Sequence, residues 1–147
     1  MQKVKVALIG LGCRGKSLAS MMNEMEEAEI VAVSDVYEDR MGDIAALVEQ
    51  SCGRAPKQYA DYRKALEAKE VDAVVIATSW ESHVTIAADS MRAGKVTALE
   101  VGGAYTVEDC ERLVRVYEET KTPFMFLENC CYGKFELLST ALVRRGM

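Results

Sequence analysis

The 147-residue chain lacks a long apolar run, and none of its stretches is long enough to cross a bilayer. It also lacks an excess of basic residues, because 18 lysines and arginines stand against 23 aspartates and glutamates, which gives a net charge of −5. An acidic chain disfavours nucleic acid and anionic lipid as partners. We therefore expect a protein that has neither a nucleic acid nor a membrane as its partner.

Histidine and cysteine are too few, or too irregularly spaced, for several kinds of active site. A Ser-His-Asp triad would have to use His83, the single histidine. The five cysteines are odd in number and form no C-x-x-C, which argues against a zinc site and against a secreted disulfide framework. We expect no metal, and reduced, buried thiols in a cytoplasmic protein; an exported, longer precursor is the alternative.

Glycine, in contrast, is concentrated in one pattern near the start of the chain. The apolar run Val4–Ile9 predicts a buried strand, and Lys16–Met25 predicts a helix. Residues 10–15 join them with the sequence GLGCRG, which matches G-x-G-x-x-G. A strand before this pattern and a helix after it are typical of a dinucleotide-binding turn.

Each glycine of the pattern has a physical reason. Gly10 allows the tight turn off the strand, Gly12 lets a pyrophosphate approach the backbone, and Gly15 lets the helix pack on the strand. The N–H groups at the helix N-terminus, where Cys13 and Arg14 lie, are expected to hold the phosphates. Cys13 has a second interpretation as a reactive thiol, because a helix N-terminus lowers a thiol pKa.

An acidic residue follows at the spacing that this turn requires. Glu29–Ser34 predicts the next strand, and Asp35 stands at its carboxyl end, where a carboxylate can accept the hydroxyls of an adenosine ribose. The same carboxylate would repel a 2′-phosphate, although Arg40 could offset that repulsion. We therefore predict NAD as the cofactor in preference to NADP.

A competing motif uses the same residues. Residues 10–17 also match G-x-x-x-x-G-K-[ST], the phosphate loop of nucleoside triphosphatases, with Lys16 and Ser17 in the key places. Asp35 could then be the acidic metal partner at a strand end. A glycine turn that binds nothing is a third interpretation. The spacing of Asp35 and the close pair Gly10 and Gly12 favour the dinucleotide.

Strands and helices alternate along the rest of the chain. Strands are predicted at 71–77, 96–99 and 124–127, helices at 38–50, 62–69, 83–93, 107–120 and 133–145, and a loop at 54–58. This alternation predicts an α/β fold, a doubly wound parallel sheet of the NAD(P)-binding Rossmann type. Ligands bind such sheets outside the carboxyl ends of the strands, so the residues after each strand are the candidates for a site.

The residues after the predicted strands are GLG (10–12), Asp35, TSWESH (78–83), EVGG (100–103) and ENCCY (128–132). These strand ends resemble the Gfo/Idh/MocA family of sugar-handling, nicotinamide-dependent oxidoreductases. In that family the fourth strand ends in a T-P-N-x-x-H type segment and the fifth in E-K-P. Here residues 78–83 are TSWESH, so that Ser79 and Trp80 replace the proline and asparagine. Residues 100–102 are EVG, so that Val101 replaces the lysine that commonly assists hydride transfer.

These departures resemble one branch, the NAD-dependent glycosidases of glycoside hydrolase family 109. The segments that carry the resemblance are TSWESH (78–83), EV (100–101), YTVEDC (105–110) and LENCCY (127–132). The resemblance implies hydrolysis by transient oxidation. Tightly held NAD takes a hydride from C3 of the sugar, a base removes the C2 proton, the C1 group leaves, water adds, and the hydride returns.

The resemblance also implies roles for single residues, each with an alternative. Tyr132 is a candidate base, or else a phenol that covers the cofactor. Glu100 would orient the nicotinamide ribose or the sugar, or else only serve a helix end. His83 is a catalytic candidate, or else a polar residue at a helix start. Among the other strand-end residues, we expect the nicotinamide end of NAD to contact Thr78, Trp80 and Asn129, with Trp80 as a wall of the cleft or a core side chain.

The resemblance spans the whole chain as the family's N-terminal cofactor domain. We therefore expect residues 1–147 to be one NAD-binding domain, with a C-terminal substrate domain outside this chain. The full-length protein would act on a sugar or glycoside and form a homo-oligomer, whereas the fragment would bind NAD without turnover. A net NAD-dependent sugar dehydrogenase and a non-catalytic nucleotide-sensing module are the alternatives.

Overall fold

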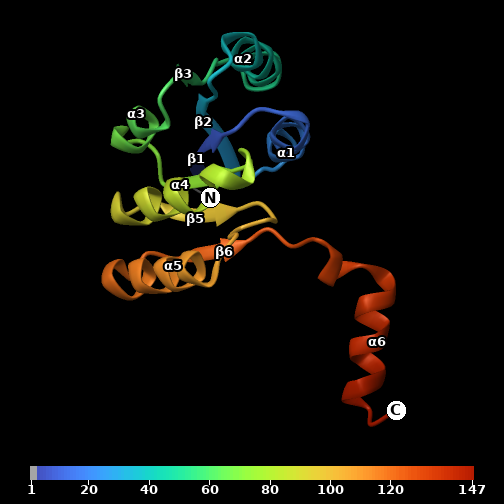
Figure 1. Ribbon diagram of the computed structural model, residues 1–147. Helices are drawn as coiled ribbons and strands as arrows, with labels where there is room; N and C mark the ends of the chain where they lie inside the picture. The colour runs from blue at the N-terminus through green and yellow to red at the C-terminus, as the bar shows by residue number, and fades with distance from the viewer. Residues whose placement is uncertain (1–2) are drawn as a thin grey trace.

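Six parallel strands form one sheet in the order β3-β2-β1-β4-β5-β6 (Figure 1). The computed structural model describes residues 3–147. The strands are β1 (Val4–Ile9), β2 (Ala28–Ser34), β3 (Lys57–Tyr59), β4 (Ala73–Ile76), β5 (Val96–Leu99) and β6 (Phe124–Phe126). The helices are α1 (Cys13–Asn23), α2 (Glu38–Cys52), α3 (Tyr62–Glu67), α4 (Trp80–Arg92), α5 (Val107–Thr120), the 3₁₀ turn η1 (Cys130–Tyr132) and α6 (Lys134–Arg144). The prediction of a doubly wound parallel sheet is confirmed.

Helices cover both faces of the sheet. Along β1, Val6 and Leu8 point to one face, where they pack with side chains of α1 and α2 such as Ile44. Ala7 and Ile9 point to the other face and pack with side chains of α3, α4 and α5. The central strands are therefore buried on both sides, which explains their continuous apolar sequence.

The strand order reverses between β1 and β4. The chain first builds β1, β2 and β3 outward in one direction, and it then returns to place β4 on the other side of β1. The loops after β1 and β4 consequently diverge and leave a crevice at the carboxyl edge of the sheet. Ligands bind open parallel sheets at such a reversal point.

Most element boundaries differ from the predicted ones by a few residues, and one strand was not predicted. α1 begins at Cys13 rather than Lys16, because Gly12 is extended and its carbonyl already accepts from Lys16 N at 2.8 Å. α4 begins at Trp80 rather than His83. β3 falls where a loop was predicted, because its three residues are polar or half-exposed and only their pairing with β2 makes them a strand.

The cysteines differ from their predicted burial. All five are free thiols, as expected, but each is exposed, because they lie at helix ends and on outer helix faces rather than in the sheet core. No helix within residues 3–147 is both long and apolar enough to pass through a bilayer.

α6 stands apart from the sheet. It follows β6 and η1 and extends away from the layered body of the molecule (Figure 1). None of its residues is buried, and its apolar side chains, including Phe135, Leu138 and Val143, are exposed. The sheet and its covering helices are therefore complete before this helix begins.

Candidate functional site

The glycine turn after β1 has the geometry that a phosphate-binding turn needs. Gly10 has a φ of +89°, and a Cβ on it would lie 2.6 Å from the backbone of Ala77, so the turn requires glycine. A Cβ on Gly15 would collide with the carbonyl of Gly10, so α1 packs directly on the turn. A Cβ on Gly12 would meet nothing closer than Arg40, at 3.9 Å, so the space above this backbone is open.

The same geometry argues against the phosphate loop of triphosphatases. Only residues 10–12 form the turn, because the helix has begun at Cys13 and Lys16 lies within it. The Lys16 ammonium lies 3.1 Å from Asp43 on α2 instead of reaching over the turn. The free N–H groups of the first turn of α1 are left to face the crevice, where they can bind an anion.

Asp35, at the end of β2, is fixed by three neighbours. Its Oδ2 accepts from Leu11 N at 2.6 Å, and its Oδ1 accepts from Tyr37 N at 3.0 Å. The guanidinium of Arg40 lies 3.8 Å from Oδ2, and the carboxylate is only 6% exposed. Two backbone N–H groups therefore hold the carboxylate beside the glycine turn, so the two parts of the predicted motif are joined in space.

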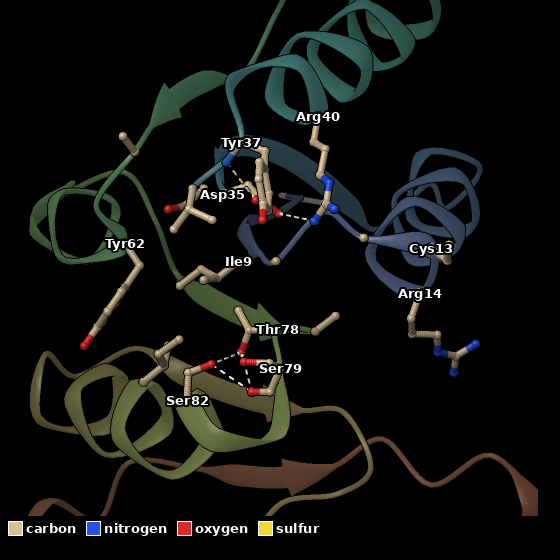
Figure 2. A pocket seen from close by; sticks show the side chains of 17 residues that line it. Ile9, Cys13, Arg14, Asp35, Tyr37, Arg40, Tyr62, Thr78, Ser79 and Ser82 are labelled. Carbon is tan, nitrogen blue, oxygen red and sulfur yellow. Dashed lines mark hydrogen bonds and ion pairs between the residues drawn. The ribbon is translucent and has the colours of Figure 1, made fainter.

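A cavity of about 670 Å³ opens at this point (Figure 2). Its walls come from the ends of β1, β2 and β4 and from the starts of α1 and α4. Of the predicted cofactor residues it is lined by Gly10, Gly12, Cys13, Arg14, Asp35 and Thr78, whereas Gly15, Trp80, Glu100 and Asn129 lie outside its lining. The volume falls in the range of small-molecule sites.

Several residues of this cavity were not predicted. The ring of Tyr37 lies under the Arg40 guanidinium, 4.2 Å from ring centroid to Cζ, on the same side of the cavity as Asp35 (Figure 2). Tyr62 and Ser82 line other parts of the wall. Burial and the hydrogen bond to Asp89 raise the pKa of Tyr62 to about 12. Of these unpredicted cavity residues, only Tyr37 could have been found from the sequence, because it stands two residues after Asp35.

Glu100 follows β5 and contacts the start of α1. Its Oε1 accepts from Nε of Arg14, and its Oε2 accepts from Val101 N at 2.9 Å. The Glu100 side chain is 12% exposed and that of Arg14 is 42% exposed. The pair joins the start of α1 to the end of β5 across the carboxyl edge of the sheet.

Trp80 lies at the start of α4 against the loop after β5. Gly102 has a φ of +99°, and a Cβ on it would collide with the indole, so only glycine allows this contact. The ring of Tyr105 lies 6.3 Å from the Trp80 ring, centroid to centroid. Trp80 is nevertheless 55% exposed, so it forms a partly open aromatic wall at the end of β5 and is not a core side chain.

His83 is the most buried of the predicted site residues, at 1% exposure. Its Nε2 lies 3.1 Å from the carbonyl of Thr78, which can only accept, so Nε2 carries the proton. Its Nδ1 has no hydrogen-bond partner within the part of the chain that the structure describes. Burial lowers the pKa of this imidazole, while the Thr78 carbonyl and the negative charge of Glu100 oppose that shift.

The remaining candidates lie beyond β6. Asn129 is exposed just before η1, and Tyr132 ends η1 with 76% of its surface exposed. Neither lines the cavity, and the other two catalytic candidates, Glu100 and His83, do not line it either. Within residues 3–147 no group of three His, Cys, Asp or Glu side chains is arranged to hold a metal ion.

The fold and the glycine turn define an NAD-binding Rossmann domain. The Gfo/Idh/MocA family, an oxidoreductase family with an NAD-binding Rossmann fold, matches residues 4–127. The chain therefore belongs to this family. The resemblance drawn from the strand ends is confirmed, and so is the prediction of NAD as the cofactor.

Curated relatives and solved structures extend this comparison. A glycosyl hydrolase family 109 protein of Akkermansia muciniphila is 34% identical over 151 residues, which cover 100% of the chain and 31% of the relative. An α-N-acetylgalactosaminidase of Bacteroides fragilis is 33% identical over 147 residues, which cover 98% of the chain and 35% of the relative. A scyllo-inositol dehydrogenase of Lactobacillus casei, crystallised with NAD(H) and scyllo-inositol, shares the fold with a TM-score of 0.87 at 19% identity, over 99% of this chain and 42% of that one. The chain thus spans only about a third of these two curated relatives.

Proposed function

We propose that the chain is the cofactor domain of a longer, NAD-dependent enzyme that hydrolyses a glycoside through transient oxidation of its sugar. The observation that carries this proposal is the end of β5. The side chain after Glu100 is Val101, which is exposed and has no group that can donate or accept a proton. Dehydrogenases of the family commonly have a lysine at this position that assists hydride transfer. Two of the curated relatives are named as glycosidases instead: a family 109 glycosyl hydrolase and an α-N-acetylgalactosaminidase.

The residues that line the cavity fit the adenosine ribose and the diphosphate of the cofactor. Asp35 is oriented to accept the hydroxyls of the adenosine ribose, and the open backbone at Gly12 leaves room for the diphosphate. Neighbouring strands lie about 4.8 Å apart, so β4 and β5 are the next positions along the edge for the nicotinamide half. There we assign Thr78, Trp80 and Glu100 to that half.

When bound, NAD supplies the acceptor and later the donor of the hydride at the sugar C3, without net oxidation. The chain's own residues would hold and orient the reactants. Glu100, held by Arg14 and by a backbone N–H, is placed to orient the nicotinamide ribose or the sugar. We keep Tyr132 as a candidate base, or as a phenol that covers the cofactor. His83 is buried and hydrogen-bonds the carbonyl of Thr78. We therefore propose that it holds the segment after β4 in place and does not contact the substrate.

We propose further that a second domain, outside residues 1–147, completes the substrate site. Length supports this proposal, because the relatives are about three times as long as this chain. We expect the full-length protein to be a homo-oligomer that acts on a sugar or glycoside.

The test compares two readouts on the full-length protein. Cleavage of an aryl glycoside without accumulation of NADH supports the glycosidase, and omission or removal of NAD should abolish it. Accumulation of NADH with free sugars would instead establish a net dehydrogenase. Binding of NAD without activity on any sugar would indicate a nucleotide-sensing module. The 147-residue chain should bind NAD but give no turnover in either assay.

A further inference from the structure

Arg14 and Glu100 are 86 positions apart, yet their side chains form an ion pair across the carboxyl edge of the sheet. Arg14 is the second residue of α1, next to the phosphate-binding turn, and Glu100 is the first residue after β5. β4 lies between β1 and β5, so the pair spans the end of a whole strand. It therefore connects the place assigned to the diphosphate with the place assigned to the nicotinamide half.

The atoms used by this pair leave Arg14 with unused donors. Glu100 has both carboxylate oxygens engaged, one by Nε of Arg14 and one by Val101 N. A guanidinium has five N–H donors, and the Glu100 contact takes only the one on Nε. Within residues 3–147 the two Nη groups of Arg14 have no other hydrogen-bond partner. They lie at the start of α1, whose N–H groups and dipole also attract an anion.

The negative charges of Glu100 and of a bound diphosphate require a cation near both. A diphosphate at the glycine turn brings negative charge to the same edge as the Glu100 carboxylate, and like charges repel. Arg14 pairs with Glu100 and also lines the cavity beside the glycine turn, so it can pair with both at once, because its donors are arranged in a fork.

We propose that Arg14 is a positioning residue that holds Glu100 through Nε while its Nη groups bind the cofactor diphosphate. The inference rests on the proposed function, in which Glu100 serves the nicotinamide half. Cofactor binding and the orientation of Glu100 are then coupled, because the same guanidinium is fixed by both. An ordinary exposed ion pair, in contrast, would contribute little to stability and nothing to cofactor affinity.

The test is a double-mutant cycle on NAD affinity, measured by calorimetric titration of the 147-residue chain. The proteins are wild type, Arg14→Met, Glu100→Gln and the double variant. Arg14→Met should raise the Kd for NAD about tenfold or more, because a charged hydrogen bond is lost and Glu100 is left facing the diphosphate. Glu100→Gln should lower NAD affinity less than Arg14→Met does, because only the charge of Glu100 is lost and Arg14 stays available to the diphosphate.

The decisive quantity is the non-additivity. With Glu100→Gln already present, Arg14→Met should cost at least about threefold less affinity than it costs in the wild type. Additive effects of the two substitutions on NAD affinity would overturn the inference. Thermal unfolding of the four NAD-free proteins supplies a second readout, because a merely structural pair would show the same coupling there, and we expect the coupling in NAD-free stability to be smaller than that in NAD affinity.

A matched pair at the opposite edge of the sheet is the control. Lys57 and Glu70 are 2.9 Å apart with side chains 56% and 29% exposed, and they too link segments from different strands. Lys57→Met and Glu70→Gln should leave NAD affinity unchanged. If the wild type fails to bind NAD at all, the proposed function is wrong. If it binds NAD and the cycle is additive, only the role of Arg14 is wrong.

Discussion

We expect cofactor choice to depend most on Asp35. Its carboxylate is held by the backbone N–H groups of Leu11 and Tyr37, so it stabilises the glycine turn, and we propose that it also binds the ribose. Arg40 lies nearby, but it stacks on Tyr37 and approaches Asp35, which leaves the local charge balanced rather than positive. This arrangement explains how an arginine can stand close to the ribose site of an NAD-binding domain.

Asp35→Asn tests this role with little change of shape, because the amide oxygen can still accept from Leu11. We expect NAD affinity to fall about tenfold, since a charged hydrogen-bond acceptor for the ribose is lost. Affinity for NADP should fall less or rise, because the repulsion of the 2′-phosphate is removed. Calorimetric titrations with both cofactors measure this. Glu38→Gln, an exposed neighbouring charge, is the control, and an unchanged ratio of the two affinities would contradict the assignment.

We expect the single histidine, His83, to make the stability of the chain depend on pH. Burial lowers its folded pKa below the ordinary 6.5, so its contribution to stability is present above that value. As the pH falls through about 6.5, the unfolded chain takes up a proton that the folded chain does not, and stability decreases. Urea unfolding at several pH values around 6.5 should show this decrease in the wild type.

The control for this prediction is His83→Gln, which keeps an N–H donor for the Thr78 carbonyl but does not titrate. Its stability should be lower than that of the wild type at neutral pH and nearly constant over the same pH interval. An equal pH dependence in both proteins would mean that carboxylates, not the buried imidazole, cause the effect. The single histidine makes the assignment direct.

At the scale of elements, the sequence predicted the helices and strands that have a clear hydrophobic pattern of their own. β1, β5 and α5 have the predicted bounds, because an apolar run or an amphipathic helix with a Thr106 cap is a local signal. β3 was missed because three residues carry too little pattern, and only the edge of β2 makes them a strand. The start of α4 at Trp80 was missed even though Ser79, a residue type favoured at N-caps, directly precedes it.

α6 is the element whose removal should matter least to stability. An isolated helix of 11 residues is marginal in water, and none of its residues is buried. We expect truncation after residue 128 to change the free energy of unfolding by less than about 1 kcal/mol. Met91→Ala in α4, at a fully buried position, should by comparison cost about 2–5 kcal/mol. Chemical unfolding measures both, and an equally large loss on truncation would show that α6 packs on the sheet.

At the scale of the whole molecule, the site is produced by topology. The glycine turn and Asp35 could be predicted because their spacing is local and β1 pairs with β2. Tyr62 and Ser82 could not, because α3 and α4 bring them to the cavity from segments with no motif. The Arg14–Glu100 pair could not be predicted either. It depends on the strand order, in which β4 lies between β1, which precedes Arg14, and β5, which precedes Glu100.

Cofactor binding should stabilise the whole chain. NAD at about 100 times its Kd should raise the free energy of unfolding by about 2.7 kcal/mol, because it binds only the folded state. ATP with Mg²⁺ at the same concentration should give a smaller effect, since residues 13–16 are helical and form no phosphate loop. Differential scanning calorimetry with each ligand provides the measurement. Greater stabilisation by ATP and Mg²⁺ would revive the triphosphatase interpretation.

The three glycines of the turn also determine what a saturation mutagenesis library would report. Substitutions at Gly10 and Gly15 collide with backbone, so a screen would score misfolded protein there and mistake it for lost recognition. Gly12 alone has room for a Cβ in the ligand-free protein. Variants at that one position should stay folded and soluble, so their ranking by side-chain size would map the space that the cofactor occupies.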